Sequence, residues 1–246
     1  MNPESLKEAL KAGREIQLRS YVLRDQGEQK LERIIQAIMG HYGQADAAGP
    51  IHAAIREIVQ NASKANLKRI LFSERGLDLG QPEDYERGMS VFKEHLVKSE
   101  LARYRPRLEA LGMQFEVSFL HSAQVLIVSV VNHFPLTLAE EQRIREKFQQ
   151  SRSLDNLYDF FIQYGDATEG AGMGIAMVEI LMEQAGLDRH NFVLYSTGGK
   201  TIARLVLPFD PAYRTPRQQF ADLLREGYTP DELRHQVRLG HIELIY

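Results

Sequence analysis

Three polar residues stand at helical spacing in the segment that begins at Ile51. Glu57, Asn61 and Lys64 occupy positions i, i+4 and i+7, so on a helix their side chains point the same way. An asparagine carbonyl oxygen suits Mg²⁺ as a ligand, and a lysine supplies a point charge for phosphate. The spacing indicates either a site for a metal and a phosphate or the polar face of an ordinary amphipathic helix.

A second candidate for phosphate chemistry is a run of alternating glycines, Gly170, Gly172 and Gly174, which leads into the apolar segment 175–182. Glycines at the start of a helix leave backbone N–H groups bare at the positive end of the helix dipole, and this favours an anion. Glycines also serve tight turns. Taken alone, the run therefore favours phosphate binding and a turn about equally.

These residues need a fold that positions them, and the apolar patterns predict one that combines helices with strands. The N-terminus is expected to form a helical hairpin from helices over 4–25 and 27–40, which either lies solvated or dimerises the protein. The next expected elements are a helix over 51–67, a strand over 69–72, a long helix over 82–111, strands over 114–120 and 125–131, and a helix from about Thr137. The glycine run then opens a helix. A closing hairpin over 191–207 and two short tail helices follow, the second tail helix opened by a capping box at Thr229.

The composition limits the compartment and the class of partner. The net charge is −3 and the chain has no cysteine. This gives no electrostatic reason to expect nucleic acid, and it leaves no thiolate for a metal or for catalysis. The 8 histidines show no paired metal-ligand spacing. No apolar run is long enough to span a bilayer, and the N-terminus lacks the apolar core of a signal peptide. A cytoplasmic protein without a membrane segment is expected.

The order of these elements resembles the GHKL superfamily, which includes the ATP-binding domain of sensor histidine kinases, DNA gyrase and mismatch-repair ATPases. The resemblance rests on the Glu-x-x-x-Asn-Ala-x-Lys helix, the glycine run and the closing hairpin, and it covers residues 51–209. It implies an α/β (α+β) two-layer sandwich with a mixed sheet and helices on one face, plus the N-terminal helical hairpin. The expected domains are the hairpin over 1–48, a histidine-kinase-like ATPase domain over 49–210 and a helical tail over 211–246.

The resemblance also implies that the site holds Mg²⁺ and the phosphates of ATP. Asn61 matches the metal ligand of the family, and Lys64 matches a base that faces the phosphates in kinase-like members. Glu57 matches the acid that polarises water in the ATP-hydrolysing branches, which makes it the candidate catalytic residue. In the kinase branches a residue at that position need not take part in the chemistry.

Two further parts of the family site have counterparts in this chain. Gly170, Gly172 and Gly174 match the glycine box that hinges a lid over the phosphates, so the lid is expected over 149–169. Thr201 falls near a family threonine at the edge of the nucleotide, although an ordinary threonine at the start of a strand would look the same.

The adenine-binding turn departs from the family pattern. Where the family has Asp-x-Gly-x-Gly, this chain has Asn132-His133-Phe134-Pro135-Leu136. Asn132 can accept the adenine amino proton only without the charge of an aspartate, a loss of about 1 kcal/mol. Phe134 places a ring where the family keeps bare backbone, so the ring either stacks on a shifted base or fills the pocket. The double change Asn132→Asp, Phe134→Gly is predicted to restore binding of Mg²⁺-ATP.

The resemblance implies a histidine-kinase-like ATP-binding protein of bacterial signal transduction, which phosphorylates or regulates a partner signalling protein. No phosphoacceptor histidine is evident, because the first hairpin holds only His41, followed by Tyr42-Gly43. The alternative is an inactive scaffold, a pseudokinase, that dimerises and binds a regulatory partner. A helix-turn-helix fragment in the tail is a third interpretation, and its short length and balanced charge argue against DNA binding.

Overall fold

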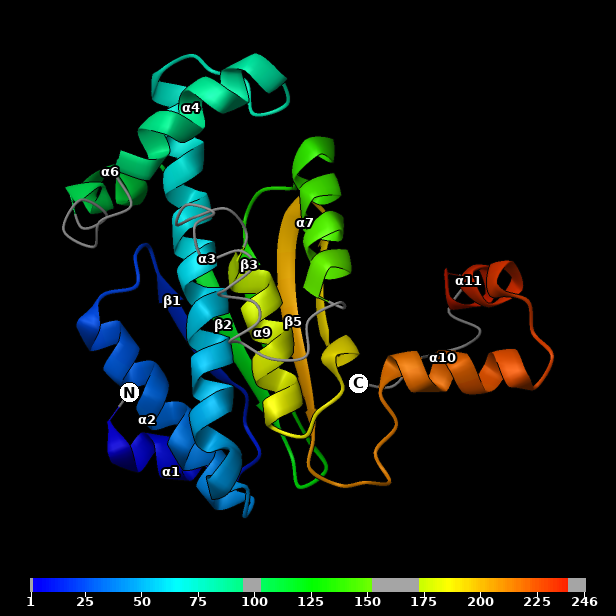
Figure 1. Cartoon of the computed structure of the whole chain (residues 1–246). Helices are drawn as coiled ribbons and strands as arrows, with labels where there is room; N and C mark the ends of the chain where they lie inside the picture. The colour runs from blue at the N-terminus through cyan, green and yellow to red at the C-terminus, as the bar shows by residue number, and fades with distance from the viewer. Residues whose placement is uncertain (1, 95–102, 152–172, 239–246) are drawn as a thin grey trace.

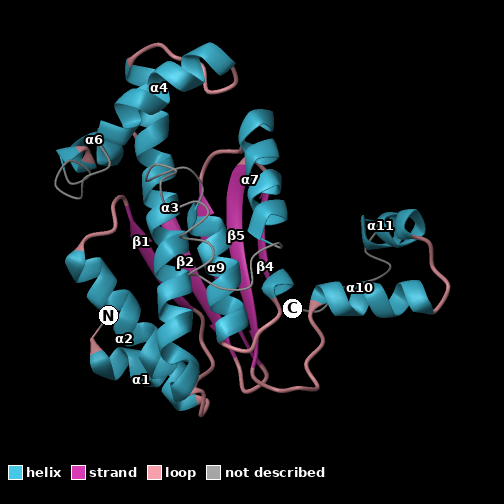
Figure 2. Cartoon of the chain, in the orientation of Figure 1, coloured by secondary structure: helices cyan, strands magenta, loops and turns pink. Residues whose placement is uncertain are grey.

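The computed structural model describes residues 2–94, 103–151 and 173–238. The sheet and the helices that cover it form a two-layer α+β arrangement, and the tail helices lie to its side (Figure 1). Five strands pair in the order β1-β2-β3-β5-β4, namely β1 (Ile16–Ser20), β2 (Phe115–His121), β3 (Val125–Asn132), β4 (Phe192–Thr197) and β5 (Lys200–Pro208). The helices are α1 (Pro3–Lys11), α2 (Asp25–His41), α3 (Ala48–Glu74), α4 (Pro82–Glu94), α6 (Arg105–Ala110), α7 (Leu138–Ser151), α9 (Met173–Gln184), α10 (Pro216–Arg225) and α11 (Pro230–Arg238). In Figure 2, α2, α3, α7 and α9 lie over one face of the sheet.

The sheet is antiparallel in all four of its described pairings, so the expected mixed sheet is wrong. Both hairpins, β2–β3 and β4–β5, are formed as expected. The second hairpin places its far strand, β5, beside β3, with Asn132 opposite Thr201. Strands β3 and β5 run in opposite directions, so this pairing is antiparallel as well. Gly198 and Gly199 form this turn with φ of 55° and 74°, values that hairpin turns need and that glycine adopts without strain.

The N-terminal segment is not the expected helical hairpin, because a strand lies between its two helices. Helix α1 ends at Lys11, and Gly13 has a φ of 59°, which turns the chain toward β1. In β1, Ile16 and Leu18 alternate with polar residues, and the strand pairs antiparallel with β2. From the sequence, these residues were predicted to belong to a helix over 4–25. A segment of five residues with two apolar positions is compatible with the period of a helix and with that of a strand. Here the pairing with β2 favours the strand.

The apolar stripe of α2 is buried inside the protein. Its members are fully or nearly fully buried and belong to the main hydrophobic core: Leu31, Ile34, Ile35, Ile38 and Met39. The expected homodimer rested on exposure of this stripe, so the structure removes that reason for dimerisation. Residues 1–48 contribute both to the sheet and to the core of residues 49–210, and a division at residue 48 does not separate two cores.

Helix α3 continues through the segment that was expected to be a strand over 69–72. Ile70 and Leu71 extend the helical pattern of buried positions that begins with Leu67. They pack with Val22 and Leu108 in a second, smaller cluster. A short run of apolar residues does not distinguish a strand from a buried helical turn, and here packing on both sides favours the helix.

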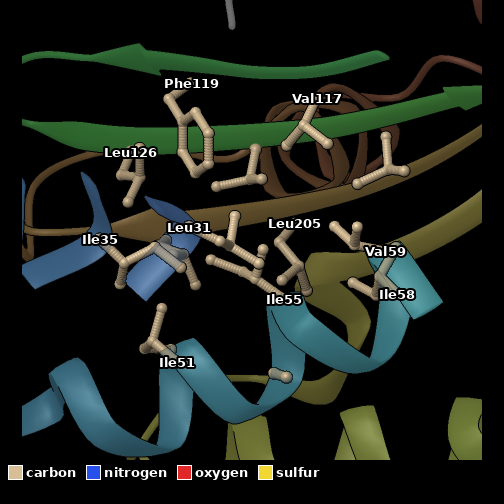
Figure 3. Packing of buried hydrophobic residues seen from close by; sticks show 14 of the residues in the cluster. Leu31, Ile35, Ile51, Ile55, Ile58, Val59, Val117, Phe119, Leu126 and Leu205 are labelled. Carbon is tan, nitrogen blue, oxygen red and sulfur yellow. The ribbon is translucent and has the colours of Figure 1, made fainter. Parts of the chain in front are cut away.

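The main core lies between α3 and the sheet (Figure 3). Ile51, Ile55, Ile58 and Val59 of α3 face the strands, and the residues opposite them are Val117, Phe119, Leu126 and Leu205, with Leu31 and Ile35 from α2. All ten are buried. Helix α3 therefore keeps its apolar side on the sheet and leaves its polar side toward α9.

The contact between α4 and α3 gives the first prediction. A Cβ atom on Gly88 would lie 2.3 Å from Cζ of the buried Phe72 ring. We expect Gly88→Ala to lower the free energy of unfolding by about 1–3 kcal/mol, because a buried ring has little room to move. Gly40→Ala is the matched control, since a Cβ there meets nothing within 4 Å. It should raise stability by up to about 1 kcal/mol. Equal effects in urea titrations would contradict the prediction.

Candidate functional site

The three polar residues of the first motif lie on α3, half-buried, on the side away from the strands. Glu57 and Asn61 are one helical turn apart, and Lys64 lies almost one turn further on. The expected helix is confirmed for this segment. The roles assigned to the three side chains stay predictions.

The start of α9 contacts this face of α3 at Gly174. A Cβ atom on Gly174 would lie 2.0 Å from Oε1 of Glu57 and 2.6 Å from Nδ2 of Asn61, so the close approach depends on glycine. Gly174 belongs to the first turn of α9, where the positive end of the helix dipole favours a negative charge. The Glu57 carboxylate stands at that place. Three of the predicted site residues thus meet at one point.

The other two predicted glycines, Gly170 and Gly172, lie outside the described residues, as does most of the expected lid. Of the lid segment 149–169, the structure describes only the last turn of α7, residues 149–151.

Asn132, the candidate adenine residue, has its amide group directed into the protein. It is 5% exposed, and its Nδ2 donates to the Ala62 carbonyl oxygen at 3.0 Å and to Oδ1 of Asn66 at 2.7 Å. Nδ2 of Asn66 in turn donates to the Met113 carbonyl oxygen at 2.7 Å. The two amides therefore tie the end of β3 to α3 and to the segment before β2.

Thr201 and Phe134 also have contacts within the protein. The Thr201 hydroxyl donates to the Phe134 carbonyl oxygen at 2.8 Å, which fastens the turn after β3 to β5. The half-buried Phe134 ring lies under the Arg69 guanidinium, whose carbon is 4.4 Å from the ring centroid. Arg69 Nη2 also donates to the Pro135 carbonyl oxygen at 3.1 Å. The turn over 132–136, which was predicted to correspond to the family's adenine-binding turn, is thus held by contacts from α3 and β5.

A buried ion cluster links α3 to α7 beside this turn. The Glu140 carboxylate accepts from Lys68 Nζ and from both terminal nitrogens of Arg69, at 2.9 Å and 2.6 Å for Arg69. The side chains of Lys68, Arg69 and Glu140 are only 15%, 13% and 7% exposed. The Thr137 backbone N–H also donates to Glu140, and Thr137 Oγ1 accepts from the Glu140 backbone, which is a capping box at the start of α7.

The environment shifts the pKa of both partners. Burial by itself would raise the pKa of Glu140, but the hydrogen bonds from Arg69 and the charges of Lys68 and Arg69 hold it well below its usual range. Burial lowers the pKa of the Lys68 ammonium, and the attraction of Glu140 only partly offsets this. We conclude that the cluster is anchored by an ionised Glu140.

Aromatic contacts extend the cluster toward α4. The Arg143 guanidinium carbon lies 3.4 Å from the ring centroid of Tyr85, and Lys68 Nζ lies 5.7 Å from the same centroid. Burial raises the pKa of the Tyr85 hydroxyl. With Arg69, three cationic side chains therefore gather between α3, α4 and α7, and two of them, Lys68 and Arg69, hydrogen-bond the Glu140 carboxylate.

The cluster was not predicted from the sequence, although one part of it has a recognisable sequence pattern. The pattern Thr137-x-x-Glu140 is a capping-box signature at the expected start of a helix. The pairing of Glu140 with Lys68 and Arg69 could not be predicted from local patterns. It joins residues about 70 positions apart, and it depends on α3 continuing past residue 67.

These contacts test how Mg²⁺-ATP fits the residues that are present. On the adenine side the Asn132 amide, the Thr201 hydroxyl and the Phe134 ring are used within the protein. On the phosphate side, Glu57 stands at the start of α9 and would repel a phosphate there unless a cation lay between them. The residues predicted to contact adenine therefore do not fit the nucleotide as the family binds it.

Among the described residues, no group of three or more His, Asp or Glu side chains is placed to hold a metal ion. In the same residues, no helix combines the length and the apolar character needed to cross a membrane.

Comparisons with known proteins were made for sequence families, curated proteins and solved structures. No family model matches the chain, and no solved structure matches it. An uncharacterized protein of Treponema pallidum (strain Nichols) is 27% identical over 221 residues, covering 90% of this chain and 43% of that protein. The chain thus spans less than half the length of this relative. Its function has to be inferred from its own residues.

Proposed function

We propose that this chain is a partner-binding module of bacterial signal transduction, related in fold to the histidine-kinase-like ATPases, that does not use ATP as a phosphoryl donor. This is the inactive scaffold of the two interpretations. Its expected location is the cytoplasm, and its expected partner is another signalling protein. The observation that carries the proposal is the inward hydrogen bonding of Asn132, the residue at the position of the family's adenine-binding aspartate.

The energy needed to break this hydrogen bonding, and one further contact, support the same proposal. To accept from an adenine in the family's manner, Asn132 would have to turn its side chain out of a buried network, leaving Asn66 Oδ1 without that donor at a cost of about 1–3 kcal/mol. The Phe134 ring and the Arg69 guanidinium would also have to separate. Weak nucleotide binding offers little energy for both changes, since a Kd of about 1 mM corresponds to about 4 kcal/mol.

The second candidate function is the ATP-binding regulator implied by the family resemblance, with Mg²⁺ held by Asn61. One observation favours it. Gly174 is in the last position of the glycine run, and its backbone lies against both Glu57 and Asn61. A glycine box beside a metal-ligating asparagine would need such an approach. The same contact is equally suited to holding α9 on α3 without a ligand.

Titration of the full chain with ATP and Mg²⁺ by calorimetry separates the two candidates. We expect no saturable binding at ATP concentrations up to about 1 mM and no autophosphorylation, because the adenine-contacting residues have internal partners. The control is the same titration of Asn61→Ala. Micromolar binding by the wild type that is lost in Asn61→Ala would overturn the proposal and favour the second candidate.

A further inference from the structure

A groove lies between α1 and α2, the two helices at the lower left of Figure 1. Its volume is about 210 Å³. Leu6, Ile34 and Ala37 form its apolar part, and three cationic residues line it as well: Lys7, Lys30 and Arg33. Two helices thus present an apolar surface with basic side chains beside it.

The helical periods explain why these residues share one surface. Lys30, Arg33, Ile34 and Ala37 occupy positions i, i+3, i+4 and i+7 of α2, which lie on one side of a helix. On α1, Leu6 and Lys7 face the same groove. The buried stripe of α2 lies next to this side, so Ile34 belongs both to the core and to the groove.

The charge of the groove is one-sided. Its lining holds three cations and no acidic residue, although the chain as a whole has a net charge of −3. The neighbouring acid Glu32 lies on a different side of α2, where its carboxylate accepts from Gln36. The groove therefore attracts a negatively charged occupant with apolar side chains.

The size of the groove selects among such occupants. Pockets for small molecules typically enclose about 300–1,000 Å³, more than is available here. An open apolar groove between helices is the usual acceptor for the apolar face of an amphipathic helix. We propose that the α1–α2 groove binds an acidic amphipathic helix of a partner protein. This inference rests on the proposed role as a partner-binding module and names the chemistry of the partner.

A labelled 15-residue peptide with leucines at helical spacing and glutamates elsewhere serves as the probe, measured by fluorescence anisotropy on the full chain. We expect saturable binding with a Kd below about 100 µM. The triple variant Lys7→Glu, Lys30→Glu, Arg33→Glu should bind at least tenfold more weakly. The matched control reverses three exposed charges outside α1 and α2, Arg14→Glu, Arg75→Glu, Lys200→Glu, and should retain binding within about twofold.

A second pair of variants tests the apolar part without changing the charge. Ala37→Phe fills the groove and should weaken peptide binding at least tenfold, whereas Gln36→Phe places the same ring outside the lining residues and should not. Circular dichroism confirms that each variant is folded. Because these variants leave the cationic residues in place, they keep the proposal testable if the triple variant does not fold.

Equal binding of a peptide with lysines in place of glutamates would overturn the proposal, as would preferential binding to anionic phosphatidylglycerol vesicles. So would a homodimer of the wild type that the triple variant does not form. Peptide binding is measured with and without Mg²⁺-ATP, so the two proposals fail separately. If neither the peptide nor ATP binds, the groove proposal is contradicted and the proposed function is not. Tight ATP binding by the wild type removes the proposed function.

Discussion

Replacement of Glu140 by alanine is expected to lower the free energy of unfolding by about 3–5 kcal/mol at pH 7. The change leaves Lys68 and Arg69 close together, mostly buried and without their carboxylate. Burial already lowers the pKa of Lys68, so the loss of its partner makes the charged form less favourable still. Urea unfolding followed by circular dichroism measures the difference from the wild type.

Glu141 provides the control for Glu140. It is its sequence neighbour but pairs on the surface with Arg145, with side chains 46% and 74% exposed. Glu141→Ala should change the free energy of unfolding by no more than about 0.5 kcal/mol, because water screens exposed pairs. A loss below about 1 kcal/mol in Glu140→Ala would show that the cluster contributes little to stability.

For Glu140→Ala compared with the wild type, we also expect the difference in unfolding free energy to depend on pH. The pKa of Glu140 is lower in the folded state than its ordinary value of 4.5. The stabilisation from its ionised form is therefore complete above pH 4.5 and is lost as the pH falls toward the folded-state pKa. The difference in unfolding free energy between wild type and Glu140→Ala should accordingly shrink below about pH 4.5. A difference that stays constant down to pH 3 would contradict the assigned shift.

The second large effect is expected at Asn132. Asn132→Asp replaces a donating amide by a carboxylate that faces two acceptors, the Ala62 carbonyl oxygen and Oδ1 of Asn66. The position is 5% exposed, so we expect a loss of about 2–4 kcal/mol in the free energy of unfolding at pH 7. Thermal and urea unfolding both report this loss.

Asn2→Asp is the matched control for Asn132→Asp. The Oδ1 of Asn2 accepts from the Ser5 backbone at the start of α1, and an aspartate accepts there equally well. A change of less than about 0.5 kcal/mol is expected. Equal effects at the two positions would show that the Asn132 amide is not an important donor.

The Asn132 contacts also revise the double change predicted from sequence. Asn132→Asp, Phe134→Gly was expected to restore the adenine-binding turn. In the folded protein it would break the tie between β3 and α3 and remove the ring under Arg69. We therefore expect the double variant to lose stability before it gains affinity for Mg²⁺-ATP.

Patterns that are local in sequence predicted much of the fold. The β2–β3 and β4–β5 hairpins were predicted from two apolar runs each and from the turns between them, and the helix after the glycine run from its periodic apolar residues. The prediction was wrong at β1 and at the end of α3. At both places a few apolar residues fit two periods, and only distant partners, β2 and Leu108, distinguish them.

The candidate site was predictable to a similar degree. Helical spacing placed Glu57 and Asn61 on one face of α3. The glycine run was expected to bind phosphate or to form a turn, and the contact of Gly174 with Glu57 and Asn61 was not predicted. The direction of the Asn132 side chain was not predictable, because it depends on the position of α3 relative to the end of β3. The Glu140 cluster was missed because its cations lie on a helix that was expected to have ended.

The place of β1 in the sheet has a consequence for how the protein is synthesised. On the ribosome, β1 is made about 95 residues before β2, the strand with which it pairs. At typical elongation rates this interval lasts about 5–20 s, far longer than a hairpin needs to form. The nascent chain therefore carries β1 without its partner strand until β2 emerges, and a chaperone that binds exposed apolar segments would find a target there.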